Sequence, residues 1–253
     1  MKVVVCPGQG SQKSDTSDTA IVQPLIVSES LVSFAQSELG ATMVAGHSVG
    51  MVTAFAIAGC YSFETAIELA KVRGQIFHDV AKSSHSGMSA LIGKNVVQVF
   101  SELDSPLEVA VVNSDSQIVV AGLNSELDKL SESAPRGIRA TSLRVSGAFH
   151  TSAMLPAVAA FSEVLQDVEI TQPTIPVISD LTGEIIHDGV KEHLLAQITN
   201  PVRWDLVTSK IQKLLTNSDE IHEIIELAPS GTLSALLKRN LQLEHVKLKC
   251  LQR

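Results

Sequence analysis

Short apolar runs alternate with stretches of helical periodicity over the first 80 residues and again after residue 147. Residues 2–6 form a β-branched run that predicts a buried strand ending at a glycine-rich turn, and residues 41–45 predict a second strand. Apolar residues recur at helical spacing over 20–39, and an amphipathic pattern over 63–80 predicts a longer helix. The same reading predicts further helices at 51–58, 153–165, 190–198, 207–215 and 233–237, and strands at 177–179 and 221–227. This alternation predicts a mainly parallel α/β sheet covered on both faces.

The segment from 84 to 146 has a different order of predicted strands and helices. Its pattern predicts strands at 88–92, 107–112, 117–121 and 141–145, with helices at 96–103 and 125–131. That order, βαββαβ, is the split-βαβ arrangement of a ferredoxin-like domain. We therefore divide the chain into a large α/β catalytic domain, 1–83 and 147–253, and an inserted ferredoxin-like subdomain, 84–146. Clefts between domains are favoured ligand sites, so we expect the functional site between these two parts.

Composition narrows the class of protein. The chain has 253 residues, of which 45% are hydrophobic and 18% charged, and this excludes a disordered chain. A formal net charge of −8 leaves no basic surface of the kind that nucleic-acid binding requires. No apolar run reaches the ~18 residues of a membrane span, and the N-terminus lacks a signal-peptide pattern. Three scattered cysteines do not form a disulfide framework or a metal site. We therefore expect a cytoplasmic enzyme acting on small molecules, without contact to nucleic acid or membrane.

The segment Gly46-His47-Ser48-Val49-Gly50 matches the G-x-S-x-G pattern of a nucleophile elbow. As a bare pattern it has low specificity, but here an apolar strand precedes it and a compact helix follows it, which is the context that the pattern requires. An elbow places the serine on a sharp strand-to-helix turn, where the helix N-terminus faces charge that develops at the reacting carbonyl. Ser48 is thus the candidate nucleophile, on an α/β-hydrolase-like turn.

A serine nucleophile needs a general base, and His150 is the best placed of the eight histidines. It follows the last predicted strand of the insert, where the chain returns to the large domain at the expected cleft. Taken alone, a single histidine after a strand is more often structural than catalytic. The other histidines outside the elbow lie in helical or polar stretches typical of solvated side chains: His78, His85, His187, His193, His222 and His245. Arg73 is a further candidate, since a guanidinium in a cleft would bind a carboxylate through two hydrogen bonds. From its position on a helix alone, however, a surface arginine is the favoured interpretation.

Eight short motifs occur along the chain in an order that is known from one protein family. They are PGQGSQ at 7–12, QP at 23–24, GHSVG at 46–50, VRG at 72–74, NSDSQIVVAG at 113–122, SGAFHTSAM at 146–154, QITNPVRW at 197–204 and LAPSGTLSALLKR at 227–239. The chain resembles the malonyl-CoA:acyl carrier protein transacylases of type II fatty acid synthesis and the related acyltransferase domains of polyketide synthases. That family carries its ferredoxin-like subdomain where the insert is predicted here.

The resemblance implies a ping-pong acyl transfer without a cofactor. Ser48 would attack the thioester of malonyl-CoA with His150 as general base, and free CoA would leave. The phosphopantetheine thiol of acyl carrier protein would then take the malonyl group from the serine. The backbone N–H groups of Gln9 and Val49 would form the oxyanion hole, and such donors typically supply ~3–4 kcal/mol each.

The resemblance also assigns roles around the substrate. Arg73 would hold the malonyl carboxylate, and the backbone carbonyl of Gln197 would orient His150 in place of a triad acid. Asn113 would support the cleft, and Phe149 would fill the space that a branched extender needs, a discrimination of only ~1–3 kcal/mol. The family's members resemble monomers, and we expect one here. Because carrier proteins are acidic, we expect docking on a basic rim, for which the candidates are Arg203, Lys238, Arg239 and Lys82.

Two departures from the family pattern bear on the site. The segment between residues 12 and 46 is shorter than usual, which would open the edge of the cleft. Asp180 stands where the family tends to have asparagine, and from the sequence its carboxylate could equally contact His150 or face solvent.

Two other functions remain to be weighed. A serine hydrolase of acyl-CoA or acyl carrier protein would form the same acyl-enzyme but let water compete with the thiol. Arg73 argues against it, because neutral acyl chains have no use for a buried guanidinium, whereas a more open cleft argues for it. A non-catalytic relative that scaffolds a synthase would be expected to lack Ser48, His150 or Arg73, and all three are present.

Overall fold

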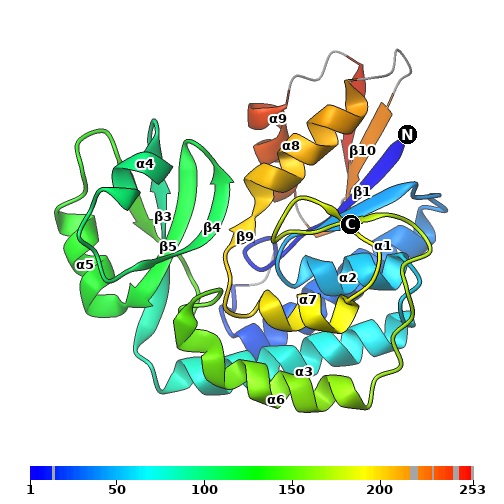
Figure 1. The fold of residues 1–253 in the computed structure, drawn as a ribbon, viewed down its shortest axis with the longest axis horizontal. Helices are drawn as coiled ribbons and strands as arrows, with labels where there is room; N and C mark the ends of the chain where they lie inside the picture. Colours follow the sequence, from blue (N-terminus) through cyan, green and yellow to red (C-terminus); the bar gives the residue numbers. More distant parts are fainter. Residues whose placement is uncertain (13–14, 217–221, 230, 242–244, 252–253) are drawn as a thin grey trace.

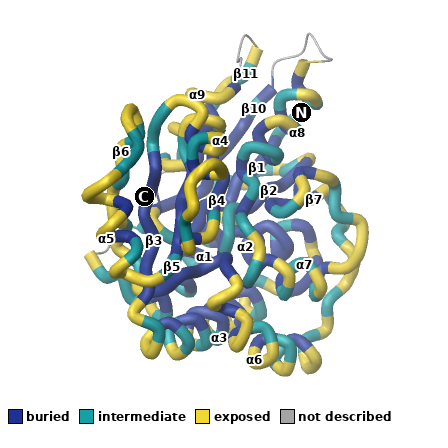
Figure 2. The backbone as a smooth tube through the Cα atoms, turned by 60° about the vertical axis from the view of Figure 1, so that its left-hand side comes forward, coloured by how far each residue is buried: buried dark blue, intermediate teal, exposed yellow. Residues whose placement is uncertain are grey.

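The protein is a mixed α/β structure with two sheets (Figure 1). The computed structural model describes residues 1–12, 15–216, 222–229, 231–241 and 245–251. A six-stranded sheet has the order β11-β10-β1-β2-β7-β8, and a five-stranded sheet has the order β6-β3-β5-β4-β9. The inner strands of both sheets are mostly buried, whereas the edge strands β6 and β11 are partly exposed (Figure 2).

The larger sheet is parallel except for β8, which pairs antiparallel with β7. At its centre, three consecutive valines of β1 are fully buried, as a strand covered on both faces requires. Its strands are β1 (Lys2–Cys6), β2 (Met43–Gly46), β7 (Val177–Ile178), β8 (Ile185–Ile186), β10 (His222–Glu226) and β11 (Val246–Cys250).

Helices cover both faces of this sheet. They are α1 (Thr19–Gln36), α2 (Gly50–Ile57), α3 (Phe63–Lys82), α6 (Leu155–Gln166), α7 (Val190–Ala196), α8 (Trp204–Leu215) and α9 (Thr232–Asn240), with a short 3-10 helix at Ser152–Met154. Because side chains alternate along a strand, Val4 and Val44 pack among α1, α2, α3, α6 and α7, while Val3 and Val5 pack against α8 and α9. The predicted parallel sheet with helices on both faces is confirmed.

The smaller sheet lies beside the larger one (Figure 1). It contains β3 (Ser86–Ile92), β4 (Glu108–Ser114), β5 (Gln117–Leu123), β6 (Arg139–Ser142) and β9 (Val202–Arg203), and it carries α4 (Val96–Ser101) and α5 (Asn124–Glu132). Leu91, Ile118 and Val120 pack under these two helices. Four strands pair antiparallel, whereas β9 adds parallel to β4 from beyond the 84–146 segment. The segment that contains β9 therefore connects the smaller sheet to the part of the chain outside 84–146.

Several predicted boundaries differ from the observed ones. The strand predicted at 141–145 lies at Arg139–Ser142, because those residues pair with β3. The helix predicted over 20–39 ends at Gln36, and Glu38 beyond it has a left-handed φ of 49°. The sequence pattern gave no prediction for β8, β9 or β11. Residue 221, the start of one predicted strand, lies outside the described residues. Among the helices of the described ranges, none is both long and apolar enough to cross a bilayer.

Candidate active site

Ser48 lies on the turn between β2 and α2 in a left-handed conformation, with φ of 55°. Two glycines allow this turn to pack closely. A Cβ atom on Gly46 would lie 2.3 Å from the backbone carbon of Gly50, and a Cβ on Gly50 would lie 2.1 Å from the backbone oxygen of Cys6. No side chain fits at such distances, so the glycines bring the helix directly onto β1 and β2. The turn thereby presents Ser48 at the end of the strand.

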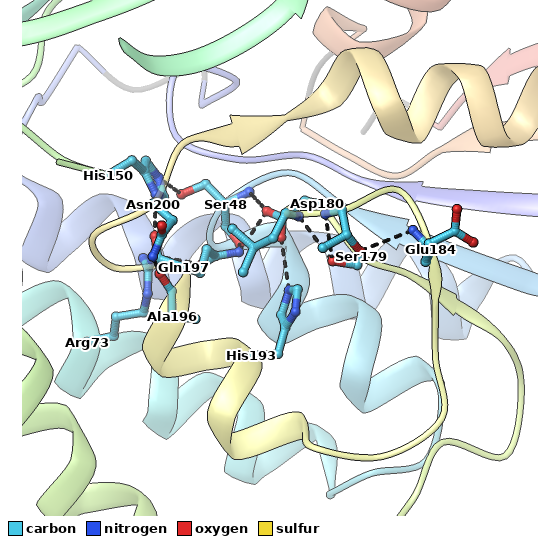
Figure 3. Close-up of polar contacts among 12 residues, drawn as sticks. Ser48, Arg73, His150, Ser179, Asp180, Glu184, His193, Ala196, Gln197 and Asn200 are labelled. Atoms are coloured by element: carbon cyan, nitrogen blue, oxygen red, sulfur yellow. Dashed lines mark hydrogen bonds and ion pairs between the residues drawn. The ribbon is translucent and has the colours of Figure 1, made fainter. Parts of the chain in front are cut away.

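The hydroxyl of Ser48 faces the ring of His150 (Figure 3). Oγ of Ser48 lies 2.7 Å from Nε2 of His150, and Nδ1 of the same ring lies 2.7 Å from the backbone oxygen of Gln197. A carbonyl oxygen can only accept, so Nδ1 carries the ring hydrogen and Nε2 is free to accept from the hydroxyl. The pair has the geometry of a nucleophile and its general base.

The environment keeps His150 neutral. Burial and, to a smaller extent, the nearby charge of Arg73 together lower the pKa of His150 to about 4, against the opposing effect of the hydrogen bond to Gln197. At neutral pH the imidazole is therefore unprotonated and able to take a proton. Its loop is fixed at both sides, since the N–H of Ala148 donates to Ser86 Oγ at 3.0 Å and Thr151 Oγ1 donates to the oxygen of Ala148 at 2.6 Å.

Two backbone N–H groups near Ser48 are available to a ligand. Gln9 and Val49 both line the cavity that contains Ser48, and within the described part of the chain neither N–H donates to another protein group. The glycine-rich loop that carries Gln9 approaches the turn closely, because a Cβ on Gly8 would lie 2.4 Å from the backbone oxygen of His47. Val49 also precedes the first turn of α2, where the helix dipole favours negative charge.

Arg73 of α3 is fully buried. Its Nη1 donates to Oε1 of Gln23 at 2.6 Å, and its Nη2 donates to Oε1 of Gln197 at 3.0 Å. The guanidinium carbon lies 4.1 Å from the centre of the Phe77 ring, a cation–π arrangement. Burial lowers the pKa of Arg73 to about 9, so the group stays charged at neutral pH. Arg73 is therefore not the surface arginine that its place on a helix alone would suggest.

A cavity of about 480 Å³ opens over Ser48 between the two sheets. The small sheet contributes an apolar wall, to which Asn113 of β4 and Gln117 of β5 add polar groups. Phe149 also lines it, with its ring centre 5.3 Å from that of Phe77. Arg73 and Gln197 do not line the cavity, but Gln23 and Phe77, which contact Arg73, do.

Helix α9 forms the remaining wall. The buried carboxylate of Glu226, at the end of β10, accepts from the N–H groups of Leu233 at 3.0 Å and Ser234 at 2.6 Å. This carboxylate therefore anchors the start of α9 to the larger sheet. From α9, Leu236 and Arg239 reach the cavity, so one of the basic residues expected at the rim is part of the cavity wall.

Sequence reasoning left the position of Asp180 open, and the structure places it fully buried beside Ser48 (Figure 3). Its carboxylate accepts from the N–H of Ser48 at 3.1 Å and from Nε2 of Gln197 at 2.7 Å, and its other oxygen lies 3.0 Å from Nε2 of His193. It bonds neither His150 nor solvent. Two signals were present in the sequence: Asp180 lies two residues after the end of β7, and His193 precedes Gln197 by one helical turn.

The prediction that the histidines outside the elbow and His150 are solvated is wrong for two of them. His193 contacts Asp180 and packs edge-on to Phe55, with ring centres 5.7 Å apart. His222 is buried beside the N-terminus, whose ammonium donates to its Nδ1 at 3.1 Å. Tertiary contacts bury both rings, and such contacts leave no trace in local sequence polarity.

Comparisons with known proteins place this site in a family. Residues 14–250 match the model of the acyl transferase domain. A malonyl CoA-acyl carrier protein transacylase of Mycolicibacterium smegmatis is 36% identical over 245 residues, which are 93% of this chain and 83% of that protein. The crystal structure of MCAT from Mycobacterium tuberculosis superposes with a TM-score of 0.89 at 31% identity, covering 99% of this chain and 96% of that one. A malonyl CoA-acyl carrier protein transacylase from Burkholderia pseudomallei superposes with a TM-score of 0.86 at 26% identity, covering 94% and 97%. The chain thus belongs to the acyl transferase domain family.

Proposed function

We propose that this protein transfers a malonyl group from malonyl-CoA to the phosphopantetheine thiol of acyl carrier protein through an ester on Ser48. The names of the relatives support both substrates. The observation that carries the proposal is the buried cation of Arg73, which lies next to the reacting pair and bonds only to neutral amide oxygens in the described part of the chain. A buried charge of this kind is stabilised by a carboxylate, and the malonyl group supplies one.

The first half-reaction follows from the Ser48–His150 geometry. Nε2 of His150 takes the hydroxyl proton while Oγ attacks the thioester carbonyl, and the N–H groups of Gln9 and Val49 stabilise the oxyanion. When the C–S bond breaks, the imidazolium returns the proton to the sulfur of CoA. Ser48 then carries the malonyl ester.

The second half-reaction reverses these steps with a different thiol. The phosphopantetheine thiol gives its proton to His150 and attacks the ester carbonyl, and Ser48 Oγ recovers the proton as the ester bond breaks. Gln197 keeps the ring in the required tautomer throughout, since its carbonyl accepts only from a protonated Nδ1. No cofactor takes part in either step.

Two finer features of the architecture belong to this proposal. The turn of Ser48 serves as a nucleophile elbow, supported by its φ of 55° and the two close-packed glycines. The small part of the chain serves as a ferredoxin-like subdomain, supported by the strand order β6-β3-β5-β4 with α4 and α5 on one face. The large domain, 1–83 and 147–253, then supplies the nucleophile, and the subdomain, 84–146, supplies the apolar wall of the substrate cavity.

Hydrolysis of acyl thioesters is the less favoured function. A neutral acyl chain would leave the charge of Arg73 without a partner from the substrate. The cavity walls near Phe149, Leu143 and Val145 are apolar, and they favour a bound acyl arm over ordered water. Transfer to a thiol therefore fits the site better than transfer to water.

Carrier-protein docking involves the exposed end of α9. Lys238 is exposed there, whereas Arg239 also lines the cavity and so meets the pantetheine arm of both substrates. Arg203 is a weaker candidate, because its guanidinium is paired with Asp205 at 3.0 and 2.8 Å. A Lys238→Glu substitution should raise the KM for carrier protein and leave the KM for malonyl-CoA unchanged, with Lys129→Glu on the exposed face of α5 as the control.

The transfer itself is tested by steady-state kinetics with malonyl-CoA and holo carrier protein, following malonyl-carrier by mass. The proposal predicts parallel double-reciprocal lines, as a ping-pong reaction gives, and no product with Ser48→Ala. Intersecting lines with product formation by Ser48→Ala would contradict it. Release of malonate at the transfer rate without carrier protein would instead identify a hydrolase.

A further inference from the structure

The buried carboxylate of Asp180 contacts both the nucleophile Ser48 and the end of α7, which positions the general base His150. Oδ2 of Asp180 accepts from the backbone N–H of Ser48 and from the side-chain amide of Gln197, and Oδ1 accepts from Nε2 of His193 (Figure 3). The residue is fully buried, and it does not line the substrate cavity. It therefore reaches the chemistry through other groups.

The first of these groups is the backbone of Ser48. A left-handed φ of 55° is unfavourable for a serine and persists only where the surroundings fix it. Asp180 accepts from the N–H of Ser48 at 3.1 Å, and Nε2 of Gln197 donates to the oxygen of Ser48 at 3.0 Å. The same Nε2 donates to Asp180, so the carboxylate and its amide partner hold both polar backbone groups of the nucleophile.

The second group is the end of α7. His193 and Gln197 lie one helical turn apart and donate to the two oxygens of the same carboxylate. This contact fixes the end of the helix at which the backbone oxygen of Gln197 accepts from Nδ1 of His150. A shift of α7 would move His150 away from Ser48, even though Asp180 bonds neither the ring nor the hydroxyl.

We propose that Asp180 is a positioning residue that sets the relative placement of Ser48 and His150, and that His193 is its partner in this role. The required property is the acceptor oxygen facing Ser48 and Gln197. An asparagine oxygen can replace it, because the asparagine NH₂ would then face Nε2 of His193, which accepts in its other tautomer. A leucine of similar size offers no acceptor.

The test rests on the proposed function and compares Asp180→Leu with Asp180→Asn, using exposed Asp188→Asn as the matched control. Single-turnover malonylation of Ser48 is measured over a range of malonyl-CoA concentrations. Because small misplacements of reacting groups cost about 100-fold, Asp180→Leu should lower the maximal rate by about that factor. The half-saturating concentration should stay within about twofold, since no substrate contact is lost, and Asp180→Asn should remain within about fivefold of the parent.

A second pair of variants covers the case in which Asp180→Leu does not fold, judged by its thermal midpoint. His193→Leu removes only the bond to Oδ1 and should lower the maximal rate about tenfold, while His193→Gln, which keeps a donor, should restore it. Exposed His187→Gln is the control for this pair. Normal rates in folded Asp180→Leu or His193→Leu, or equal loss in Asp180→Asn and Asp180→Leu, would overturn the proposal.

Labelling of Ser48 by a fluorophosphonate separates this proposal from the proposed function. The reagent reports the reactivity of the Ser48–His150 pair without malonyl-CoA, and its rate should fall in the same variants. If the parent protein reacts with the fluorophosphonate but forms no malonyl ester, the proposed function fails while the positioning role stands. If the parent forms the ester and folded variants label at its rate, the positioning role fails alone.

Discussion

Nδ1 of His150 donates to the backbone oxygen of Gln197 at 2.7 Å, in the place where a carboxylate often holds a catalytic histidine. A carbonyl fixes the tautomer without contributing a full negative charge. The imidazolium therefore receives less stabilisation than it would beside a carboxylate. The pKa of His150 is then determined mainly by its burial and by the charge of Arg73.

The pH dependence follows from this environment. The pKa of His150 is lowered from 6.5 to about 4, so the ring becomes protonated only as the pH falls through about 4. We expect kcat/KM for the acylation of Ser48 to be flat from neutral pH down to about 5 and to fall below it, because this parameter reports the free enzyme. A fluorophosphonate, which has no carboxylate, controls for titration of malonyl-CoA. An acid limb centred near 6.5 for both reagents would contradict the lowered pKa.

Arg73→Ala should separate malonyl from acetyl groups. Removal of one partner from a buried charge pair costs about 3–5 kcal/mol, so malonylation of Ser48 should fall by a factor of about 150 to 5,000. Acetylation from acetyl-CoA should change little, because that group has no carboxylate. Lys71→Ala, an exposed cation on the same helix, provides the control. Equal loss with both acyl-CoA substrates would show that Arg73 supports the fold and not the substrate.

Phe149→Ala should broaden the range of acyl groups accepted. The ring lines the cavity beside Ser48 and packs on Phe77, so its removal makes room for a branched extender. A methyl-sized difference is worth about 1–3 kcal/mol, so the preference for malonyl-CoA over methylmalonyl-CoA should drop by about 10- to 100-fold. Competition between the two substrates measures it. Phe100→Ala, a buried residue of α4 on the far face of the small sheet, should leave the preference unchanged, and a change there would argue against a local effect of Phe149.

The turn itself can be tested with two glycines. Gly46→Ala would place a Cβ 2.3 Å from the backbone of Gly50, where neither backbone can yield, whereas Gly40 has nothing within 4 Å of such an atom. Overpacking against backbone should lower the free energy of unfolding by at least about 3 kcal/mol in Gly46→Ala. Gly40→Ala should stay within about 0.5 kcal/mol of the parent. Urea unfolding measures both, and similar stabilities would refute the close packing.

Much of the larger architecture could be predicted because its signals are local. Each local pattern indicates the surroundings of its own residues: the apolar run of β1 indicates a buried strand, the amphipathic pattern of α3 a half-buried helix, and the glycines around Ser48 a close-packed turn. The two-residue strands β8 and β9 are too short to show a period. The alternating Val246–Cys250 segment does carry a strand pattern, which the prediction overlooked.

Site residues that belong to a sequence motif could be predicted. Site residues that are positioned only by packing between distant segments could not. Ser48, His150 and the predicted oxyanion donors Gln9 and Val49 lie together around one cavity as expected. The burial of Asp180 and His193 depends on how α7 packs beside the loop after β7, which is a relation between segments. From the sequence, Asp180 could equally contact His150 or face solvent, and His193 was expected in solvent. Their shared hydrogen bond satisfies both polar groups in the interior.

Intact-mass spectrometry after mixing the protein with malonyl-CoA tests the central claim most directly. We expect a malonyl ester on Ser48 that is absent in Ser48→Ala, forms slowly in Arg73→Ala, and is discharged by holo carrier protein while persisting in water. Absence of an adduct with any acyl-CoA, or release of malonate without a thiol acceptor, would contradict it.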